Sequence, residues 1–360
     1  MMRKRFSIAT ILLAATAAWA QVAPQPAAES PYEMRYSVAA IDDATFYGGL
    51  KYPLPTVLNQ VLLEPSFGLR RRDRWNVSTS LIGQNVHSTD NYARVYVREA
   101  YAGLSAGDFD FTLGRKLVRW GTGYAFSAAG VLDPPRVATD PTDRLNVNQG
   151  RDLVKANWVR GGQALSLAWS TAALTPAAAN LHDTTAFRYN VLVREFDTSL
   201  IAGNDRGGDA FGAATFTRVF GQAWEAHGEA VWREHPALLV GGKYTAAGFT
   251  FIGEFYTPPN IAAYRGSSLS PRAGRQNYAF FHAEKARLRE LPGWKQWDVA
   301  AYAVANLDDH SSTTVVDVSR WMGNHVSAYV HLEVPGGSKT SEYGSAPYSS
   351  ATSLGVRFQL

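Results

Sequence analysis

The chain has 360 residues, a formal net charge of +4 and no cysteine. Without cysteine, disulfides and zinc sites built on thiolates are excluded, and no basic cluster with interleaved aromatic residues marks a nucleic-acid surface. Only 18% of the residues are charged, whereas 10 Trp, 17 Tyr and 17 Phe are spread along the chain, which favours a β-rich protein of the cell envelope.

The N-terminus has the order of a cleaved secretory signal. Three basic residues, Arg3 to Arg5, precede an apolar stretch from Ile8 to Ala18, and Ala18-Trp19-Ala20 offers small residues where a signal is cleaved. We expect residues 1–20 to be removed near Ala20 and the Pro- and Ala-rich residues 21–31 to form a short periplasmic tether. An ordinary amphipathic helix is the alternative. No later stretch approaches the roughly 18 uninterrupted apolar residues of a membrane-spanning helix.

Period-two alternation dominates residues 32–360. Between residues 224 and 233, for example, Trp, Ala and Gly alternate with Glu, His and Arg. A soluble β-sandwich alternates as well, so alternation alone does not decide the fold class. We predict about 18 strands, with 16 as the alternative count, near residues 32–40, 61–72, 74–86, 91–104, 107–117, 152–160, 162–171, 186–195, 196–204, 209–219, 222–234, 236–246, 248–258, 276–288, 294–306, 312–321, 324–334 and 350–360.

The length of each predicted connection depends on whether it follows an even-numbered or an odd-numbered strand. Those after even strands are tight, as in "RDR", "SAG", "GG", "EFD", "FGQ", "AAG", "LPG" and "MGN". Most of those after odd strands are long, at residues 41–60, 118–151, 172–185, 259–275 and 335–349. Short turns at one end and long loops at the other are typical of a transmembrane antiparallel up-and-down β-barrel, with short periplasmic turns, long extracellular loops and aromatic residues at the strand ends. We therefore predict this all-β fold for residues 32–360.

The signal sequence, the sorted loops and the alternating last strand together resemble Gram-negative outer-membrane porins and porin-like channels. The resemblance covers the whole mature chain by pattern, and the stretch "GRKLVRWG" from Gly114 to Gly121 is similar to Gly-Arg…Trp-Gly passages of porin-like families. Such barrels usually end in Phe, whereas this chain ends in Leu360 with Phe358 two places earlier. The resemblance implies the outer membrane of a Gram-negative bacterium, contact with lipid and lipopolysaccharide, recognition of the last strand by the barrel-assembly machinery, small-molecule solutes, and a homotrimer or a monomer.

A Gly-x-Gly at Gly121-Thr122-Gly123 is not a dinucleotide-binding motif, because it lacks the third glycine and a strand–helix unit. We interpret these glycines as hinges where a membrane strand breaks off into the loop 118–151, and we expect the strand's register to slip around Gly114. The resemblance to general porins implies that this third long loop folds inward and constricts the pore, with an exposed lid as the alternative. Its opposed charges would set a transverse field. The candidate constriction and pore-lining residues are Arg115, Lys116, Arg119, Asp133, Arg136, Asp140, Asp143, Arg144, Arg151 and Asp152.

In each predicted strand, charged and polar residues occupy the positions that alternate with apolar ones. If these positions face inward, the lumen wall is wet and carries more Arg than carboxylate, which predicts a mild preference for anionic solutes. Glu225, His227 and Glu229 lie on one face, but same-face residues are about 6.5–7 Å apart along a strand, so polar lining is favoured over a metal site. The candidate lumen-wall residues are Arg94, Arg98, Arg188, Arg194, Glu225, His227, Glu229, Arg233, Glu254, Glu333 and Arg357.

The function that these features favour is a passive or mildly selective channel for small hydrophilic solutes, with no cofactor and no catalytic residue. The first alternative is a substrate-specific transporter or exporter for saccharides or organic acids. The second is an outer-membrane lipid hydrolase with a Ser/His pair. The eight histidines are scattered along the chain, so we do not expect an enzyme.

Overall fold

The computed structural model describes residues 31–52, 55–71, 74–89, 91–134, 136–171, 183–205, 209–233, 236–258, 277–288 and 295–360. The expected signal peptide and nearly all of the expected tether lie outside these ranges. Regular structure within them is entirely β-strand. No helix of the described residues is long and apolar enough to cross a membrane.

Eighteen strands follow one another along the chain, and each predicted strand overlaps one of them. Their bounds are β1 Tyr32–Gly48, β2 Val57–Arg71, β3 Trp75–His87, β4 Tyr92–Ala106, β5 Phe109–Lys116, β6 Arg151–Arg160, β7 Gln163–Thr171, β8 Thr184–Val193, β9 Phe196–Asp205, β10 Asp209–Phe220, β11 Trp224–Trp232, β12 Ala237–Ala246, β13 Phe249–Thr257, β14 Tyr278–Lys285, β15 Trp297–Asn306, β16 Ser311–Trp321, β17 Val326–Gly336 and β18 Ser350–Gln359.

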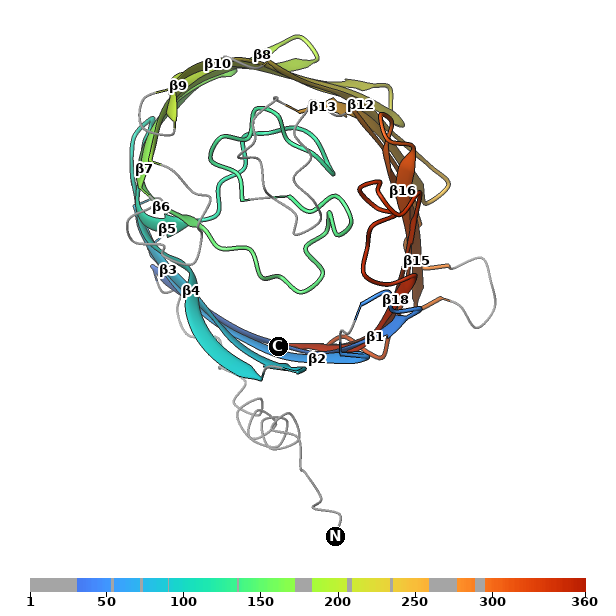
Figure 1. Cartoon of the computed structure of the whole chain (residues 1–360). Coiled ribbons are helices and arrows are strands. Elements are labelled where there is room, and N and C mark those ends of the chain that lie inside the picture. The colour runs from blue at the N-terminus through green and yellow to red at the C-terminus, as the bar shows by residue number, and fades with distance from the viewer. Residues whose placement is uncertain are drawn as a thin grey trace.

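The sheet closes on itself. Each strand pairs antiparallel with its neighbours in the sequence, and β1 also pairs with β18. Beyond the last strand residue the seam continues, because the Leu360 N–H donates to the Val38 carbonyl at 3.0 Å. Figure 1 shows the resulting ring viewed along its axis. The predicted fold class and the count of 18 strands are confirmed.

The two faces of the wall differ as alternation requires. On β18, Leu354 and Val356 are exposed on the outside, whereas Ser353 is buried on the inside. Large apolar side chains such as Leu167, Trp169 and Trp224 are likewise exposed on the outer surface. In a membrane barrel this outer face contacts lipid, and its exposure to solvent in the isolated chain is therefore expected.

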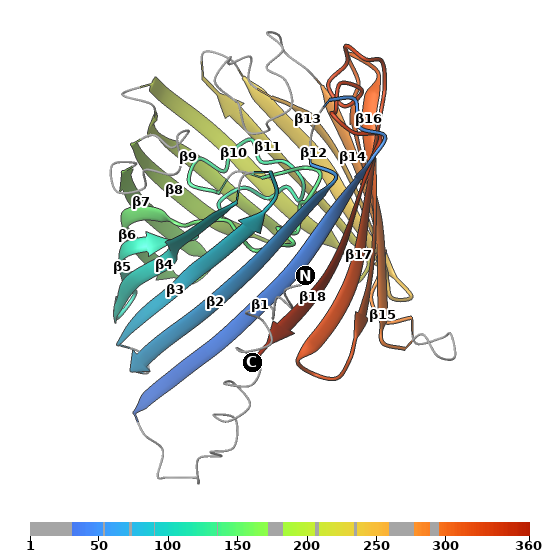
Figure 2. The same cartoon turned by 60° about the horizontal axis from the view of Figure 1, so that its bottom comes forward.

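The short connections follow even strands, and both ends of the barrel sequence lie at the short-turn end (Figure 2). Two predicted connections were wrong. Residues 286–296 separate β14 from β15, which is longer than the predicted "LPG" turn. The predicted loop 41–60 shrinks to residues 49–56, because β1 continues the inward face through Ile41, Asp43 and Thr45.

A register shift also lies elsewhere than expected. The sequence suggested a slip around Gly114, yet Gly114 pairs with Tyr101 and Arg115 with Ala100 without interruption. The shift occurs between β3 and β4, where Ser80 pairs with Glu99 and Leu81 with Val97. Arg98 is the extra residue of this bulge, and a bulge re-aims side chains locally. Arg98 and Glu99 consequently both line the interior.

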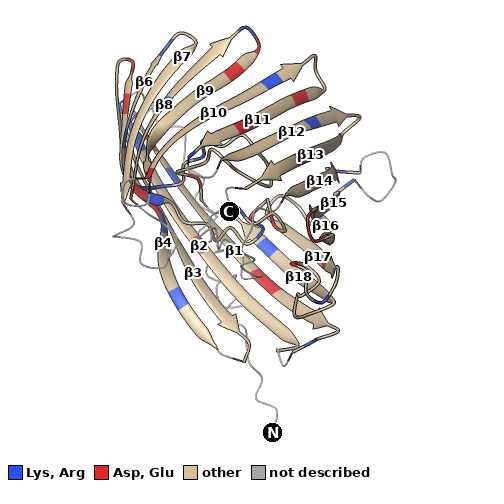
Figure 3. Ribbon diagram, turned by 45° about the horizontal axis from the view of Figure 1, so that its top comes forward, with Lys and Arg blue, Asp and Glu red and all other residues tan. Residues whose placement is uncertain are grey.

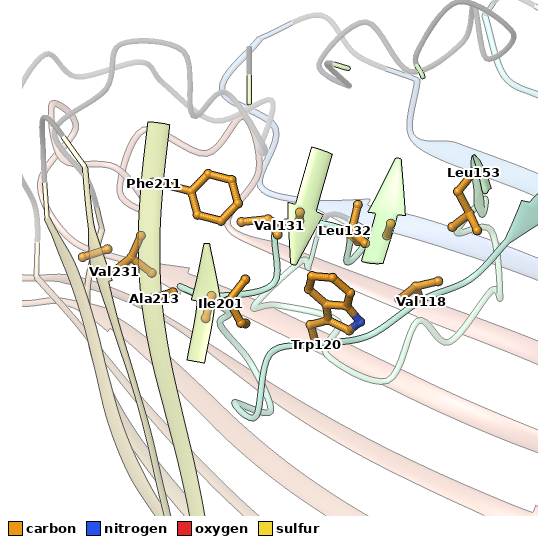
Figure 4. Packing of buried hydrophobic residues seen from close by; sticks show 13 residues of the cluster. Val118, Trp120, Val131, Leu132, Leu153, Ile201, Phe211, Ala213 and Val231 are labelled. Atoms are coloured by element: carbon orange, nitrogen blue, oxygen red, sulfur yellow. The ribbon is translucent and has the colours of Figure 1, made fainter. Parts of the chain in front are cut away.

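The hydrophobic core of this barrel lies inside the ring, between the wall and the segment 117–150. Three clusters of buried residues make up this core; the first two include residues of that segment, and Leu145 and Val147 of the segment pack against the third. In the first cluster, Val118, Trp120 and Leu132 pack against Leu153 and Ile201 (Figure 4). The segment is therefore part of the packed structure.

Candidate functional site

The segment 117–150, here called the lumen loop, leaves β5 after Lys116 and enters β6 at Arg151. Figure 1 shows it inside the ring of strands. It contacts the wall on several sides, since its buried residues pack on β6–β12 in one cluster and on β13–β16 in another. The alternative of an exposed lid is therefore wrong, and the expected inward fold is observed.

Two wall carboxylates hold the first half of the lumen loop. Glu229 of β11 accepts the backbone N–H groups of Thr122 and Gly123, the latter at 2.9 Å. Its second oxygen accepts the N–H groups of Ala128 and Ala129, both at 2.6 Å. With 2% of its surface exposed, Glu229 is a buried charge that is compensated by oriented N–H groups.

Glu254 of β13 is bound in the same way. It accepts the N–H groups of Tyr124, of Ala125 at 2.9 Å and of Phe126 at 3.3 Å. The Nε2 atom of His227 lies 3.0 Å from Oε1 of this carboxylate. Because a carboxylate only accepts, His227 donates from Nε2, and its Nδ1 has no hydrogen-bond partner among the described residues.

The Gly-x-Gly motif has a structural role that differs from the predicted hinge. A Cβ atom on Gly121 would lie 1.9 Å from Ser127 Oγ and 3.0 Å from a Glu229 oxygen. On Gly123 it would lie 2.4 Å from the Phe126 carbonyl oxygen and 2.7 Å from the Leu239 side chain. The glycines therefore let the backbone of the lumen loop approach the two wall carboxylates closely.

Asp133 and Arg136 brace the lumen loop from within. Asp133 accepts the Trp120 N–H at 2.5 Å and the Arg136 guanidinium at 3.0 Å. Arg136 also donates to the Phe126 carbonyl at 3.2 Å. Burial raises the pKa of the Asp133 carboxyl, while the Arg136 charge opposes this shift. Both residues were predicted to line a constriction, and the structure engages them mainly with the loop itself.

The second half of the lumen loop is bound to β1, β2, β4 and β17. Arg144 donates to Asp43, which is fully buried, and to the Tyr329 hydroxyl at 3.0 Å. Asn146 donates to Glu64, whose carboxylate also forms an ion pair with Arg98 at 2.9 Å. These contacts fix the loop on the side opposite to Glu229.

Asp140 and Asp143 shape turns of the lumen loop. Asp140 accepts the Arg144 N–H at 3.0 Å, and Asp143 accepts the N–H groups of Val147 and Asn148. Burial raises the pKa of the Asp140 carboxyl, and the Arg144 N–H and charge act against that shift. The aspartates that were predicted to face the pore thus serve mainly as turn-forming acceptors.

Arg115 and Asp152 were predicted to line the constriction, but the structure places them elsewhere. The two side chains bind each other at 2.7 Å. By register they share the face of Leu113 and Val154, which are exposed on the outside of the barrel. The continuous register of β5 is the reason, because Arg115 is two residues after Leu113 on the same face. They are therefore not pore-lining.

The other cations at the two ends of the lumen loop, Lys116, Arg119 and Arg151, do not share the outward position of Arg115. Lys116 lies over the Tyr101 ring, 4.3 Å from its centroid, and Arg151 donates to Thr184 at 3.1 Å on the inner face of β8. Arg119 is exposed and forms no hydrogen bond or ion pair with the described residues. Of the predicted loop cations, Arg119 is thus the one whose charge is open to solvent inside the ring.

Most predicted wall residues lie on the inner face, each with its own partner. Arg194 is a correction, because it lies in the β8–β9 turn with a φ of 57°. Arg233 follows β11 and covers the Phe211 ring. The remaining contacts are Arg94 to Gln84, Arg188 to Ser199, Glu225 to the Tyr124 hydroxyl, Glu333 to Thr313, and Arg357 to the Arg144 carbonyl.

The described residues include no group of three His, Asp or Glu side chains that could hold a metal ion. Glu225, His227 and Glu229 are divided among different partners, namely Tyr124, Glu254 and the loop N–H groups. Burial and the adjacent Glu225 raise the pKa of the Tyr124 phenol, which keeps it a hydrogen-bond donor. The triplet is a docking surface for the lumen loop.

A cavity of about 750 Å³ lies between residues 141–146 of the lumen loop and the wall of β1–β4 and β14–β18. Its charged lining was mostly missed from the sequence, although strand parity places these residues on the inner face. Six carboxylates stand against three arginines, Arg98, Arg144 and Arg357. The carboxylates are Glu64, Glu99, Asp143, Glu284, Asp298 and Asp317.

Charge is distributed unevenly around the lumen. Glu284, Asp298 and Asp317 lie on β14, β15 and β16, whereas the inner faces of β6 and β8 carry Lys155 and Arg188. In the 18-stranded order, β6 and β15 are half a turn apart. Figure 3 shows charged residues of both signs on the strands, with long uncharged stretches between them. Because the carboxylates of β14–β16 and the cations of β6 and β8 lie on opposite sides of the ring, a field across the lumen follows.

No protein-family model and no curated protein matches this sequence. Solved structures do match in fold. OpdQ of Pseudomonas aeruginosa superposes with a TM-score of 0.60 at 9% identity, covering 91% of this chain and 99% of OpdQ. OccK11 (OpdR) of the same organism gives 0.61 at 10% identity, covering 91% and 96%. A variant of the Rh. blastica porin gives 0.51 at 11% identity, covering 91% and 100%. The chain therefore has the fold of outer-membrane porins.

Proposed function

We propose that this protein is an outer-membrane channel through which small hydrophilic solutes diffuse, and that the lumen loop sets the width of the passage. The observation that carries the proposal is the attachment of this loop inside a closed barrel by Glu229 and Glu254. A loop held at several points can narrow a pore without closing it. The proposed location is the outer membrane, with cleavage of the signal near Ala20.

The apolar outer face supports lipid as the surrounding medium. Lipopolysaccharide, and the assembly machinery acting on β18, are the further partners that we propose. The residues that we assign to the passage are the exposed Arg119 and the charged residues lining the cavity beneath the loop.

The expected preference for anionic solutes is supported by fewer arginines than the sequence suggested, because several of them are paired with carboxylates. Arg98 is paired with Glu64, and Arg144 is bound to Asp43. Paired arginines contribute little net field. We therefore define the solutes by size and hydrophilicity. A substrate-specific transporter for saccharides or organic acids is the alternative within the same fold.

A lipid hydrolase is the third candidate and is disfavoured. Such an enzyme needs a nucleophile and a base on the side that meets lipid. His227, His282 and His331 lie on the inner face instead. A lipase assay with the purified protein tests this directly, and turnover of lipid esters would revive the hydrolase reading.

Liposome swelling tests the channel. Purified protein is reconstituted into vesicles, which are then placed in isotonic solutions of neutral sugars of increasing size. We expect swelling with small sugars and a sharp fall in rate as the sugar grows. Vesicles that do not swell with any sugar would contradict the proposal.

A further inference from the structure

We propose that the cavity beneath the lumen loop is a binding site for small organic cations that carry several ammonium groups. This inference rests on the proposed channel function and names a class of solute for it. The site is bounded by residues 141–146 of the loop and by the inner faces of β14–β16.

The sign of the lining charge is the first argument. Six carboxylates and three arginines line the cavity, and none of its lining residues is a lysine. Arg98 is neutralised by Glu64 at 2.9 Å, and Arg144 by Asp43 outside the lining. Among the carboxylates of the lining, Glu284 and Asp317 have 44% and 28% of their side chains exposed. The potential in the cavity is therefore negative, and a recess focuses such a potential.

His282 is the second and independent argument. Only 7% of this residue is exposed, it lines the cavity, and it forms no hydrogen bond with the described residues. Its Nε2 lies 3.7 Å from the Glu284 carboxylate, which is too long for a hydrogen bond. A buried polar side chain normally has a partner. An ammonium group between His282 and Glu284 would donate to both, whereas an anion would be repelled by Glu284.

The rest of the lining suits an organic cation better than a bare metal ion. The Tyr302, Tyr329 and Trp321 side chains line the cavity, and aromatic faces attract ammonium groups. Ser37, Ser66 and Ser80 add hydroxyl acceptors on the facing wall. No group of metal-ligand geometry occurs among the described residues. The cationic side chains Lys155 and Arg188 are not part of the lining.

The experiment uses the full barrel and spermidine as the probe. Binding is measured by isothermal titration calorimetry in detergent, and block is measured as transient closures of single channels in a planar bilayer. We expect spermidine to bind and to block, and glycerol and succinate to do neither. The double variant Glu284→Gln, Asp317→Asn should raise the half-blocking concentration by about tenfold. If the double variant fails to fold, Glu284→Gln alone supplies the comparison.

The control is Glu195→Gln, which removes a carboxylate from the β8–β9 turn, where its side chain is 66% exposed. It should leave spermidine block unchanged. Channels that conduct but neither bind spermidine nor respond to the double variant would overturn this inference and leave the channel function intact. Equal block by Mg²⁺ at the same ionic strength would overturn it too, since charge screening would then suffice. A protein that binds spermidine but never conducts would contradict the channel function alone.

Discussion

Glu229 and Glu254 are carboxylates that lie on the wall of the barrel with almost no exposure to solvent. Their charges are balanced mainly by backbone N–H groups of the lumen loop, whereas Arg144 and Asp43 balance each other across the loop's second half. Hydrogen bonds to charged groups contribute about 1.5–3 kcal/mol each, so several on one carboxylate form a strong attachment. The position of the loop therefore depends on a few residues.

The double variant Glu229→Gln, Glu254→Gln tests the first attachment. Each glutamine presents an NH₂ group to N–H donors that previously met an oxygen, so we expect the loop to detach at these points. The current noise of single channels should rise severalfold while the barrel stays folded, as judged by heat-modifiable gel mobility. Glu333→Gln is the matched control, because Glu333 contacts Thr313 of the wall. Unchanged noise in the double variant would refute the attachment.

Arg144→Ala tests the second attachment. It leaves Asp43 buried and without its cation, a situation that costs about 3–5 kcal/mol in other proteins. We expect chymotrypsin, which cuts after aromatic residues and not after arginine, to cut the loop of this variant faster than that of the native protein. Arg119→Ala serves for comparison, since Arg119 is exposed and its removal should alter ion selectivity but not proteolysis. Equal cutting of all three proteins would argue against the Arg144 contact.

At the scale of elements, the close approach of the lumen loop to the wall depends on the backbone. Gly123→Ala places a methyl group 2.4 Å from the Phe126 carbonyl and 2.7 Å from Leu239, so the loop must shift. We expect a changed single-channel conductance and a lower midpoint of thermal unfolding. Gly212→Ala on β10 is the control, because its Cβ would meet nothing within 4 Å. A Gly123→Ala channel identical to the control would contradict this role.

The strands could be predicted from the sequence because lipid and a polar lumen impose alternation on each of them, and because chain polarity sorts the connections. The partners of the lumen loop could not. Parity placed Glu229 and Glu254 inside, but it does not reveal which of many inward side chains a distant loop meets. Arg115 was misplaced because a register slip was expected around Gly114, whereas the ladder between β4 and β5 continues there without interruption.

At the scale of the whole molecule, the barrel has an apolar exterior and a core that lies inside the ring. Lipid covers the exterior in the proposed setting, and the lumen loop covers the apolar part of the interior. What remains open in the described residues is polar and charged, with carboxylates on β14–β16 facing cations on β6 and β8. This division explains how one chain can be stable in a bilayer and still offer a wet passage.

In the proposed function, solutes pass beside the lumen loop inside the barrel. Because the native chain contains no cysteine, Arg119→Cys introduces a single reactive thiol on the exposed part of this loop. The most direct measurement is the single-channel current of this variant in a planar bilayer, before and after labelling with a bulky neutral thiol reagent. We expect steady current steps that fall markedly once the label is attached. Absence of current steps in the native and unlabelled proteins, or steps that the label leaves unchanged, would contradict it.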